Sequence, residues 1–205
     1  MLTKDNLIIT ISRQKGSGGH YVGELLAKKL GIKCYDEELI IETAKASGMN
    51  EAYVTKHDEK PAHNIIYFAG QPVPMHLYME QSKVIREIAG RESCVFVGRC
   101  ADYVLRDFNN VINVFVTAPL GARIERVCRR EGLSVQEAEK LIAKVDKDRS
   151  SYYHFYSQQR LGNCANYQIC LDTSRVSIND TVEIIEDYIK RSHLDGVIKE
   201  NKEQI

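Results

Sequence analysis

Residues 7–30, LIITISRQKGSGGHYVGELLAKKL, constrain the fold of this chain more than any other stretch. The segment opens with a continuous run of apolar, mostly β-branched residues, which is typical of a strand buried on both faces of a sheet. The residues Gly16, Ser17, Gly18 and Gly19 then form a turn that only a glycine-rich backbone makes at low cost. Apolar residues next recur with helical spacing, and Gly31 follows as a helix C-cap. A strand, glycine loop and helix in this order direct backbone amides and a helix N-terminus at an anion such as phosphate.

This loop is close to the phosphate-binding P-loop motif, G-x-x-x-x-G-K-[ST], but departs from it. Gly18 takes the place of the second glycine, whereas Arg13 stands at the first glycine, Gly19 at the lysine and His20 at the Ser/Thr. Backbone amides can still cradle an anion, but the motif's cation and its magnesium-binding hydroxyl are missing. The alternative for the loop is a glycine-rich turn that only packs tightly and binds no phosphate. His20 is either a donor that faces the phosphate or an exposed residue of the first helical turn.

A length of 205 residues, with 43% hydrophobic and 27% charged residues, predicts one soluble globular domain over residues 1–205. The formal net charge is zero, so no overall basic field indicates nucleic acid as a partner. The sequence shows neither an apolar run long enough for a membrane span nor a signal peptide, so we expect no membrane partner and a cytoplasmic protein.

Six cysteines are present without a C-x-x-C pair, and their spacing predicts neither a metal site nor a catalytic thiol. Cys94 and Cys170 lie in apolar strand patterns. We expect both to be reduced and to behave as small buried hydrophobic residues.

Predicted strands alternate with predicted helices along the chain. The strands are expected at 7–11, 33–35, 94–97, 111–117 and 167–172, and the helices at 22–30, 37–47, 75–89, 120–131, 134–150 and 177–191. Residues 50–60 could form a short helix, residues 61–74 a loop or insertion, and the aromatic cluster at 152–156 is expected to pack in the core. This alternation predicts an α/β/α sandwich with a parallel sheet.

In such a sheet, ligands bind at the carboxyl ends of the strands. The glycine loop, Asp36, Gly98-Arg99 and Pro119 should therefore meet at one rim. Asp36 would act as a base toward an acceptor or cap the helix that follows it. Arg99 would face the site or pair with Asp102, three residues further on.

An arginine-rich helix follows the strand at 111–117. Arg123, Arg126 and Arg130 share one face of it, with Arg129 close by, and Arg149 follows in the next helix. Arginine binds phosphate oxygens in a bidentate manner, so the face is suited to phosphoryl transfer. The alternative is a solvated helical face with scattered salt bridges, but the position after a strand favours function.

The chain resembles the cytidylate kinase-like proteins, a branch of the P-loop nucleoside monophosphate kinases. The resemblance covers nearly the whole chain and rests on ITISRQKGSGG (9–19), YDEELI (35–40), CVFVGRCADYVL (94–105), RIERVCRREGLS (123–134), DKDRSSYYHFY (146–156) and NYQICLDTS (166–174). It implies a five-stranded core formed by residues 1–48, 91–120 and 160–192, an acceptor-binding insertion at about 49–90, and an arginine-bearing lid at about 121–159.

The resemblance also implies roles for individual residues. Donor binding would fall to the loop and its surroundings, Lys15, Gly16, Ser17, Gly18, Gly19, His20, Arg123 and Arg149, and catalysis to Arg13, Asp36, Arg99, Arg126 and Arg130. Arg13 or Lys15 is the candidate for a cation that replaces the missing lysine. No metal-ligating residue is expected.

The function that this resemblance implies is transfer of the γ-phosphoryl group of ATP, with Mg²⁺, to a nucleoside monophosphate, CMP or dCMP. Two alternatives remain open: a nucleotide- or anion-binding protein with weak or no turnover, and a kinase for a different small acceptor. The expected partners are small nucleotides, and a homodimer is an open question.

Overall fold

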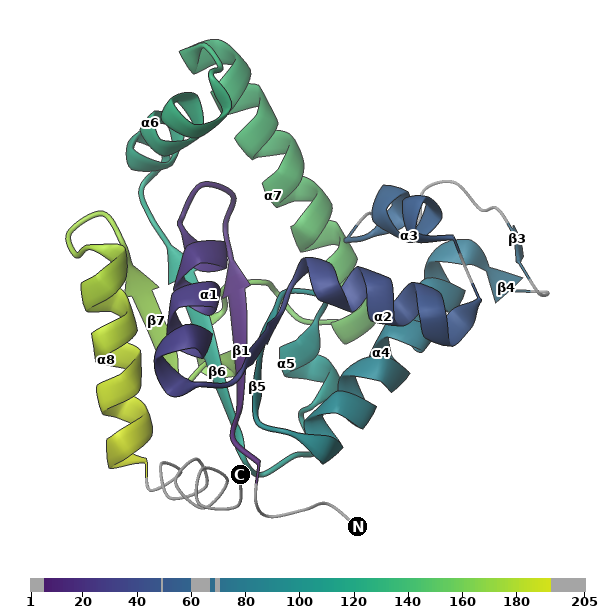
Figure 1. Ribbon diagram of the computed structural model, residues 1–205. Helices are drawn as coiled ribbons and strands as arrows, with labels where there is room; N and C mark the ends of the chain where they lie inside the picture. The colour runs from purple at the N-terminus through teal and green to yellow at the C-terminus, as the bar shows by residue number, and fades with distance from the viewer. Residues whose placement is uncertain (1–5, 49, 60–66, 69–70, 193–205) are drawn as a thin grey trace.

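The computed structural model describes residues 6–48, 50–59, 67–68 and 71–192 of the chain (Figure 1). Its centre is a parallel five-stranded sheet in the order β2-β5-β1-β6-β7. The strands are β1 (Ile8–Arg13), β2 (Lys33–Tyr35), β5 (Cys94–Val97), β6 (Val111–Thr117) and β7 (Ile169–Asp172). The expected parallel five-stranded α/β sandwich is thereby confirmed, with the glycine loop leaving the central strand.

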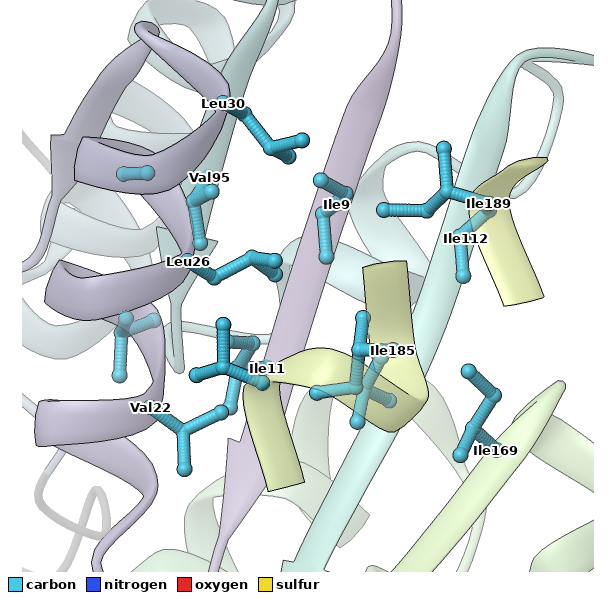
Figure 2. Packing of buried hydrophobic residues seen from close by; sticks show 14 of the residues in the cluster. Ile9, Ile11, Val22, Leu26, Leu30, Val95, Ile112, Ile169, Ile185 and Ile189 are labelled. Atoms are coloured by element: carbon cyan, nitrogen blue, oxygen red, sulfur yellow. The ribbon is translucent and has the colours of Figure 1, made fainter. Parts of the chain in front are cut away.

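The two faces of the sheet bury alternate residues of the central strand, as the period of a strand requires. Ile9 and Ile11 face α1 (Gly19–Leu30) and α8 (Ile178–Arg191), where they pack among Val22, Leu26 and Ile185 (Figure 2). Ile8 points the other way. It joins the apolar side chains of α2 (Glu37–Ser47), α4 (Val73–Arg91) and α5 (Ala101–Val104). Helices α1 and α8 thus form one outer layer, and α2, α4 and α5 form the other.

Two helices, α6 (Leu120–Glu131) and α7 (Val135–Ser157), stand beyond the carboxyl ends of the strands (Figure 1). The prediction for the second helix was wrong at its end: α7 continues seven residues past 150 and includes the aromatic cluster. The reason is burial, since Tyr152 and Tyr153 pack with Cys100 below the sheet rim. Phe155 on the same turns is 48% exposed, so the expected core position holds for only part of the cluster.

The segment between β2 and β5 also differs in detail from the prediction. It contains α3 (Glu51–His57) and a small hairpin of β3 (Tyr67–Phe68) and β4 (Gln71–Pro72). Helix α4 begins at Val73, two residues early, because a proline is tolerated in the first helical turn, where its missing N–H is not needed. Residue 60 of the possible short helix and residues 61–66 and 69–70 of the expected loop lie outside the described residues.

At the far edge, β7 begins at Ile169, two residues later than predicted. A 3₁₀ turn, Cys164–Asn166, precedes it, and Tyr167 packs its ring 5.2 Å from that of Phe115. The expectation of a buried Cys170 was wrong, because it alternates with core-facing Ile169 on an edge strand and is exposed. Cys94 is buried as expected. Among the described helices, none has the length and apolar character that crossing a membrane requires.

Candidate active site

The glycine loop between β1 and α1 adopts a conformation that needs its glycines. Gly16 and Gly18 have φ values of +79° and +88°, which side chains disfavour. A Cβ at Gly16 would lie 2.9 Å from the backbone oxygen of Arg123, and one at Gly18 would lie 2.6 Å from Cδ1 of Ile178. The neighbouring elements thus enclose the loop so closely that only bare backbone fits.

The carbonyl groups of this loop are held from the side of α6 and β7. Arg126 donates to the oxygen of Ser17 at 3.2 Å and to Oγ1 of Thr173 at 2.7 Å. Thr173 in turn donates to the oxygen of Ser17 at 2.7 Å. The first helical hydrogen bond of α1 runs from Val22 to Gly18, so the amides ahead of Val22 have no partner within the helix. Unpaired amides and the positive end of a helix dipole are suited to binding an anion.

Arg123 lies behind the loop. It is 7% exposed and donates to the oxygens of Ala118 and Lys15 and to Asp146, the last at 2.5 Å. Asp146 on α7 also accepts from the amide of Lys15 at 2.7 Å. This pair therefore ties α6 and α7 to the loop and supports its shape.

Arg99 occupies the carboxyl end of β5 and is 4% exposed. Its guanidinium pairs with Asp36 and, at 2.7 Å, with Asp58, and it donates to the oxygen of Val97 at 2.8 Å. Burial alone would lower the pKa of Arg99, but Asp58, Glu59 and Asp36 raise it well above its ordinary value. Arg99 is therefore a fixed cation and does not pair with Asp102.

Asp36 connects this arginine to the helix that begins at the glycine loop. It is the N-cap residue of α2, and Nδ1 of His20 lies 2.7 Å from its Oδ2. Burial would raise the pKa of Asp36, but the charges of Arg99 and Arg13 and the hydrogen bond to His20 hold it below its ordinary value. The carboxylate is thus ionised at neutral pH and lines the pocket. Asp36 stands at the N-cap position of α2, but its side chain makes no capping hydrogen bond there.

Glu59 is the centre of a second cluster. Its carboxylate accepts from Nη1 of Arg13 at 2.6 Å, from Nε of Arg149 at 3.1 Å and from the amide of Arg99 at 3.1 Å. Burial would raise the pKa of Glu59, but Arg13, Arg149 and Arg99 hold it well below its ordinary value. Burial and the nearby charge of Arg13 lower the pKa of Arg149. Two cations from different elements therefore share one carboxylate.

The cations nearer to solvent are held more loosely. Nζ of Lys15 lies 2.8 Å from Glu131, and Arg130 contacts the same carboxylate at 2.5 Å, with Arg130 45% exposed. Exposed ion pairs contribute only about 0–1 kcal/mol. The exposed Arg130 can therefore exchange Glu131 for a phosphate group at little cost.

These groups surround one pocket of about 880 Å³ at the carboxyl ends of the strands. The expected convergence of distant segments is thereby confirmed for the loop, Asp36 and Arg99. Of the predicted site residues, all line the pocket except Ser17 and Arg123, which lie behind the loop; those that line it are Arg13, Lys15, Gly16, Gly18, Gly19, His20, Asp36, Arg99, Arg126, Arg130 and Arg149.

Sequence reasoning missed several residues that shape this pocket. Asp58 and Glu59 lie in a polar stretch without a motif, and Asp146 and Thr173 act only through tertiary contacts. The one signal in the sequence was the set of arginines expected at the site, since cations that become buried require anionic partners. That signal does not say which of the 28 acidic residues supply them.

The parallel sheet, the glycine loop after its central strand and the arginines of α6 and α7 beside that loop define an α/β protein with a P-loop-like site. Solved structures agree on the fold: a shikimate kinase from Acinetobacter baumannii in complex with shikimate has a TM-score of 0.54 at 18% identity, covering 92% of this chain and 96% of that one. At that identity the likeness concerns the fold alone.

The chain belongs to the cytidylate kinase-like family, whose model matches residues 8–175. It is similar to a cytidylate kinase of Pyrococcus horikoshii, with 29% identity over 200 residues, 96% of this chain and 94% of the relative. It is also similar to an uncharacterized protein of Eubacterium ventriosum, at 30% identity and a TM-score of 0.73, over 90% of this chain and 99% of that one.

Proposed function

We propose that the protein is a nucleotide kinase that transfers the γ-phosphoryl group of ATP to a nucleoside monophosphate, with CMP or dCMP as the acceptor. The observation that carries this proposal is one pocket in which the glycine loop faces arginines that follow β5 or lie on α6 and α7. Membership of the cytidylate kinase-like family and a cytidylate kinase among the relatives support the acceptor.

The chemistry asks mainly for positioning and charge neutralisation. The loop amides and the N-terminus of α1 would hold the donor triphosphate. Arg126 and Arg130 on α6 would contact the transferred group as the lid closes and excludes water. Asp36, ionised and fixed by Arg99, would orient the acceptor.

Magnesium fits this site only as part of the nucleotide complex. Among the described residues, no group of three or more His, Cys, Asp or Glu side chains is placed to hold a metal ion. The carboxylates that line the pocket, Asp36, Asp58 and Glu59, are each paired with arginine. Mg²⁺ commonly binds through substrate phosphates and water, so it would enter with ATP and neutralise the phosphate charge.

A second candidate, a nucleotide-binding protein with weak or no turnover, rests on a specific observation. Arg13, Arg99 and Arg149 face Asp36, Asp58 and Glu59, so buried cations and buried anions balance before any substrate binds. The motif's lysine is also absent at Gly19. A kinase for another small acceptor remains the third candidate, since the sequence of the insertion names no base-binding residue.

The test is a coupled ADP-release assay with ATP and Mg²⁺ against a panel of nucleoside monophosphates. We expect ADP formation that requires CMP or dCMP and that falls by about 10²-fold or more in Arg126→Ala. The matched control is Arg191→Ala at the exposed end of α8, which should keep its activity.

Other outcomes separate the three candidates. ADP release without acceptor dependence contradicts the proposal. If no member of the panel supports turnover, a thermal-shift titration with ATP tests for nucleotide binding. Assay of a wider panel of small acceptors then distinguishes a kinase for another acceptor from a nucleotide-binding protein.

A further inference from the structure

The altered loop raises the question of which group stabilises the donor phosphates. In the P-loop motif, a glycine ends the strand and a lysine stands beside the second glycine. This chain has the opposite pair, Arg13 at the end of β1 and Gly19 at the start of α1. The structure shows that the two positions are in direct contact.

At Gly19 there is no room for any side chain. An added Cβ would lie 2.6 Å from Cβ and 3.0 Å from Cγ of Arg13. The side chain of Arg13 therefore runs across the first residue of α1 and fills the space into which a lysine at position 19 would start. An arginine at 13 and a lysine at 19 exclude each other by steric overlap.

A second glycine makes room for the guanidinium group. A Cβ at Gly98 would lie 2.0 Å from Nη1 of Arg13 and 2.3 Å from Oε1 of Glu59. The φ of Gly98 is +81°, a left-handed conformation that side chains disfavour. Two glycines and one carboxylate thus build a slot for Arg13 at the edge of the pocket.

The other cations near the loop are engaged elsewhere. Lys15 contacts Glu131 through Nζ, and its backbone amide is bonded to Asp146. Nδ1 of His20 lies against Asp36, and Nε2 is 3.4 Å from Glu24. Arg13 is also paired, with Glu59, but its Cβ and Cγ lie against Gly19 at the start of α1, and the side chain lines the pocket.

We propose that Arg13 binds the β- and γ-phosphates of the donor in place of the missing lysine, so that the glycine and the cation of the motif have exchanged places. This inference rests on the proposed function. The described hydrogen bond to Glu59 uses Nη1, and a guanidinium has five N–H donors in a planar fork. The group can hold Glu59 and a phosphate oxygen together, and Glu59 acts as a positioning residue.

The exchange is tested by reversing it. We compare the wild type with Arg13→Gly, Gly19→Lys and the double variant Arg13→Gly/Gly19→Lys, using ATP with Mg²⁺ and CMP. Arg13→Gly should lower kcat by about 10²–10³-fold, the effect typical of removing one group that stabilises transition-state charge. Gly19→Lys alone should also lose activity, because it collides with Arg13. The double variant should recover at least about ten-fold over Arg13→Gly, since it restores the motif.

Gly90→Lys on α4 is the matched control, because nothing lies within 4 Å of a Cβ added there, and it should match the wild type. Thermal unfolding shows whether each variant is folded. A folded double variant that is no more active than Arg13→Gly overturns the assignment of Arg13. So does Arg13→Gly with wild-type kcat.

If the wild type itself does not turn over, the proposed function fails and ATP affinity decides the role of Arg13. In calorimetric titration, the Kd for ATP should then be raised at least about ten-fold by Arg13→Gly and lowered again in the double variant. Equal affinities in all three proteins overturn the inference.

Discussion

Gly98 has no side chain, and this leaves the space in which Arg13 and Glu59 pair. It lies directly after β5, and its α-carbon faces Arg13 and Glu59 closely enough that a single methyl group would overlap both. Its left-handed φ also places the amide of Arg99 where it donates to the same Glu59 carboxylate. One backbone position therefore supports the cluster on two sides.

We expect Gly98→Ala to destabilise the protein by about 1–3 kcal/mol, because it adds left-handed strain to the overlap with Arg13. Kinase activity should fall with it. Gly90→Ala is the comparison: it lies in open space on α4 and should raise stability by about 0.5 kcal/mol. Urea unfolding measures both, and equal midpoints for the two variants would contradict the steric argument.

Arg99 is so firmly bound to its carboxylate partners that replacing it should reduce stability as well as activity. Breaking a buried ion pair by removing one partner typically costs about 3–5 kcal/mol. Arg99→Ala would leave Asp36 and Asp58 without their shared cation, so we expect a loss of that size in urea unfolding. Arg106→Ala, an exposed arginine over the ring of Tyr103, should change stability by less than about 0.5 kcal/mol. Similar values for both would show that the Arg99 network is not buried in solution.

Helices α6 and α7 pack mainly on each other. Val127, Ala138 and Ile142 form a small apolar cluster between them that is separate from the main core. Helix α8, in contrast, inserts Val182, Ile185 and Ile189 into the core beside α1. Both α7 and α8 begin with a capping box, at Ser134 and Ser177. The same local signal therefore starts two helices with different tertiary support.

This difference predicts different effects of the same substitution. Ser177→Ala should lower the global free energy of unfolding by about 1 kcal/mol, the usual contribution of an N-cap. Ser134→Ala should mainly speed amide exchange in the first turns of α7, because those turns open without unfolding the core. Hydrogen exchange and urea unfolding of both variants check this, and equal effects on the global free energy would refute it.

The sequence was sufficient for elements whose own residues determine them. The strand Val111–Thr117 and the helix Leu120–Glu131 have the predicted bounds, because hydrophobic pattern, Pro119 and Gly132 are all local. The end of α7 was missed because tertiary burial of Tyr152 and Tyr153 extends it. The exposure of Cys170 was missed because a pattern cannot show which strand lies at the edge.

The molecule has zero formal net charge, yet its pocket concentrates buried charges of both signs. The arginines could be predicted from the motif and the helix face, whereas Asp58 and Glu59 could not, because they approach the pocket through the packing of α3 and its following turn. The site is a property of the assembled chain more than of any one segment.

Acid sensitivity follows from these carboxylates. Asp36 and Glu59 have pKa values below the ordinary 3.8 and 4.5 in the folded protein, so the unfolded chain binds more protons as pH falls through this range. Their stabilising contribution is full above about pH 4.5 and is lost on acidification. The pKa of Asp102 is raised by burial, so this residue favours the folded state more as pH falls, in the wild type and in every variant alike.

Glu59→Gln should therefore be less stable than the wild type at pH 7 and should lose less stability on acidification below about pH 4.5. Urea unfolding from pH 7 to pH 3 gives both curves, with Glu139→Gln on α7 as the exposed control. Parallel curves for Glu59→Gln and the wild type would show that this carboxylate does not keep its lowered pKa.

The steric exclusion between positions 13 and 19 also limits the paths by which such a loop can diverge. A chain with glycine at 13 and lysine at 19 cannot gain Arg13 first, because the two side chains would overlap. The accessible intermediate has glycine at both positions. A lineage that passes between the two loops by single substitutions must therefore cross a stage that has lost one cation before it acquires the other. Descendants should hold either arginine at 13 with glycine at 19 or glycine at 13 with lysine at 19. Two large side chains at these positions together should be selected against.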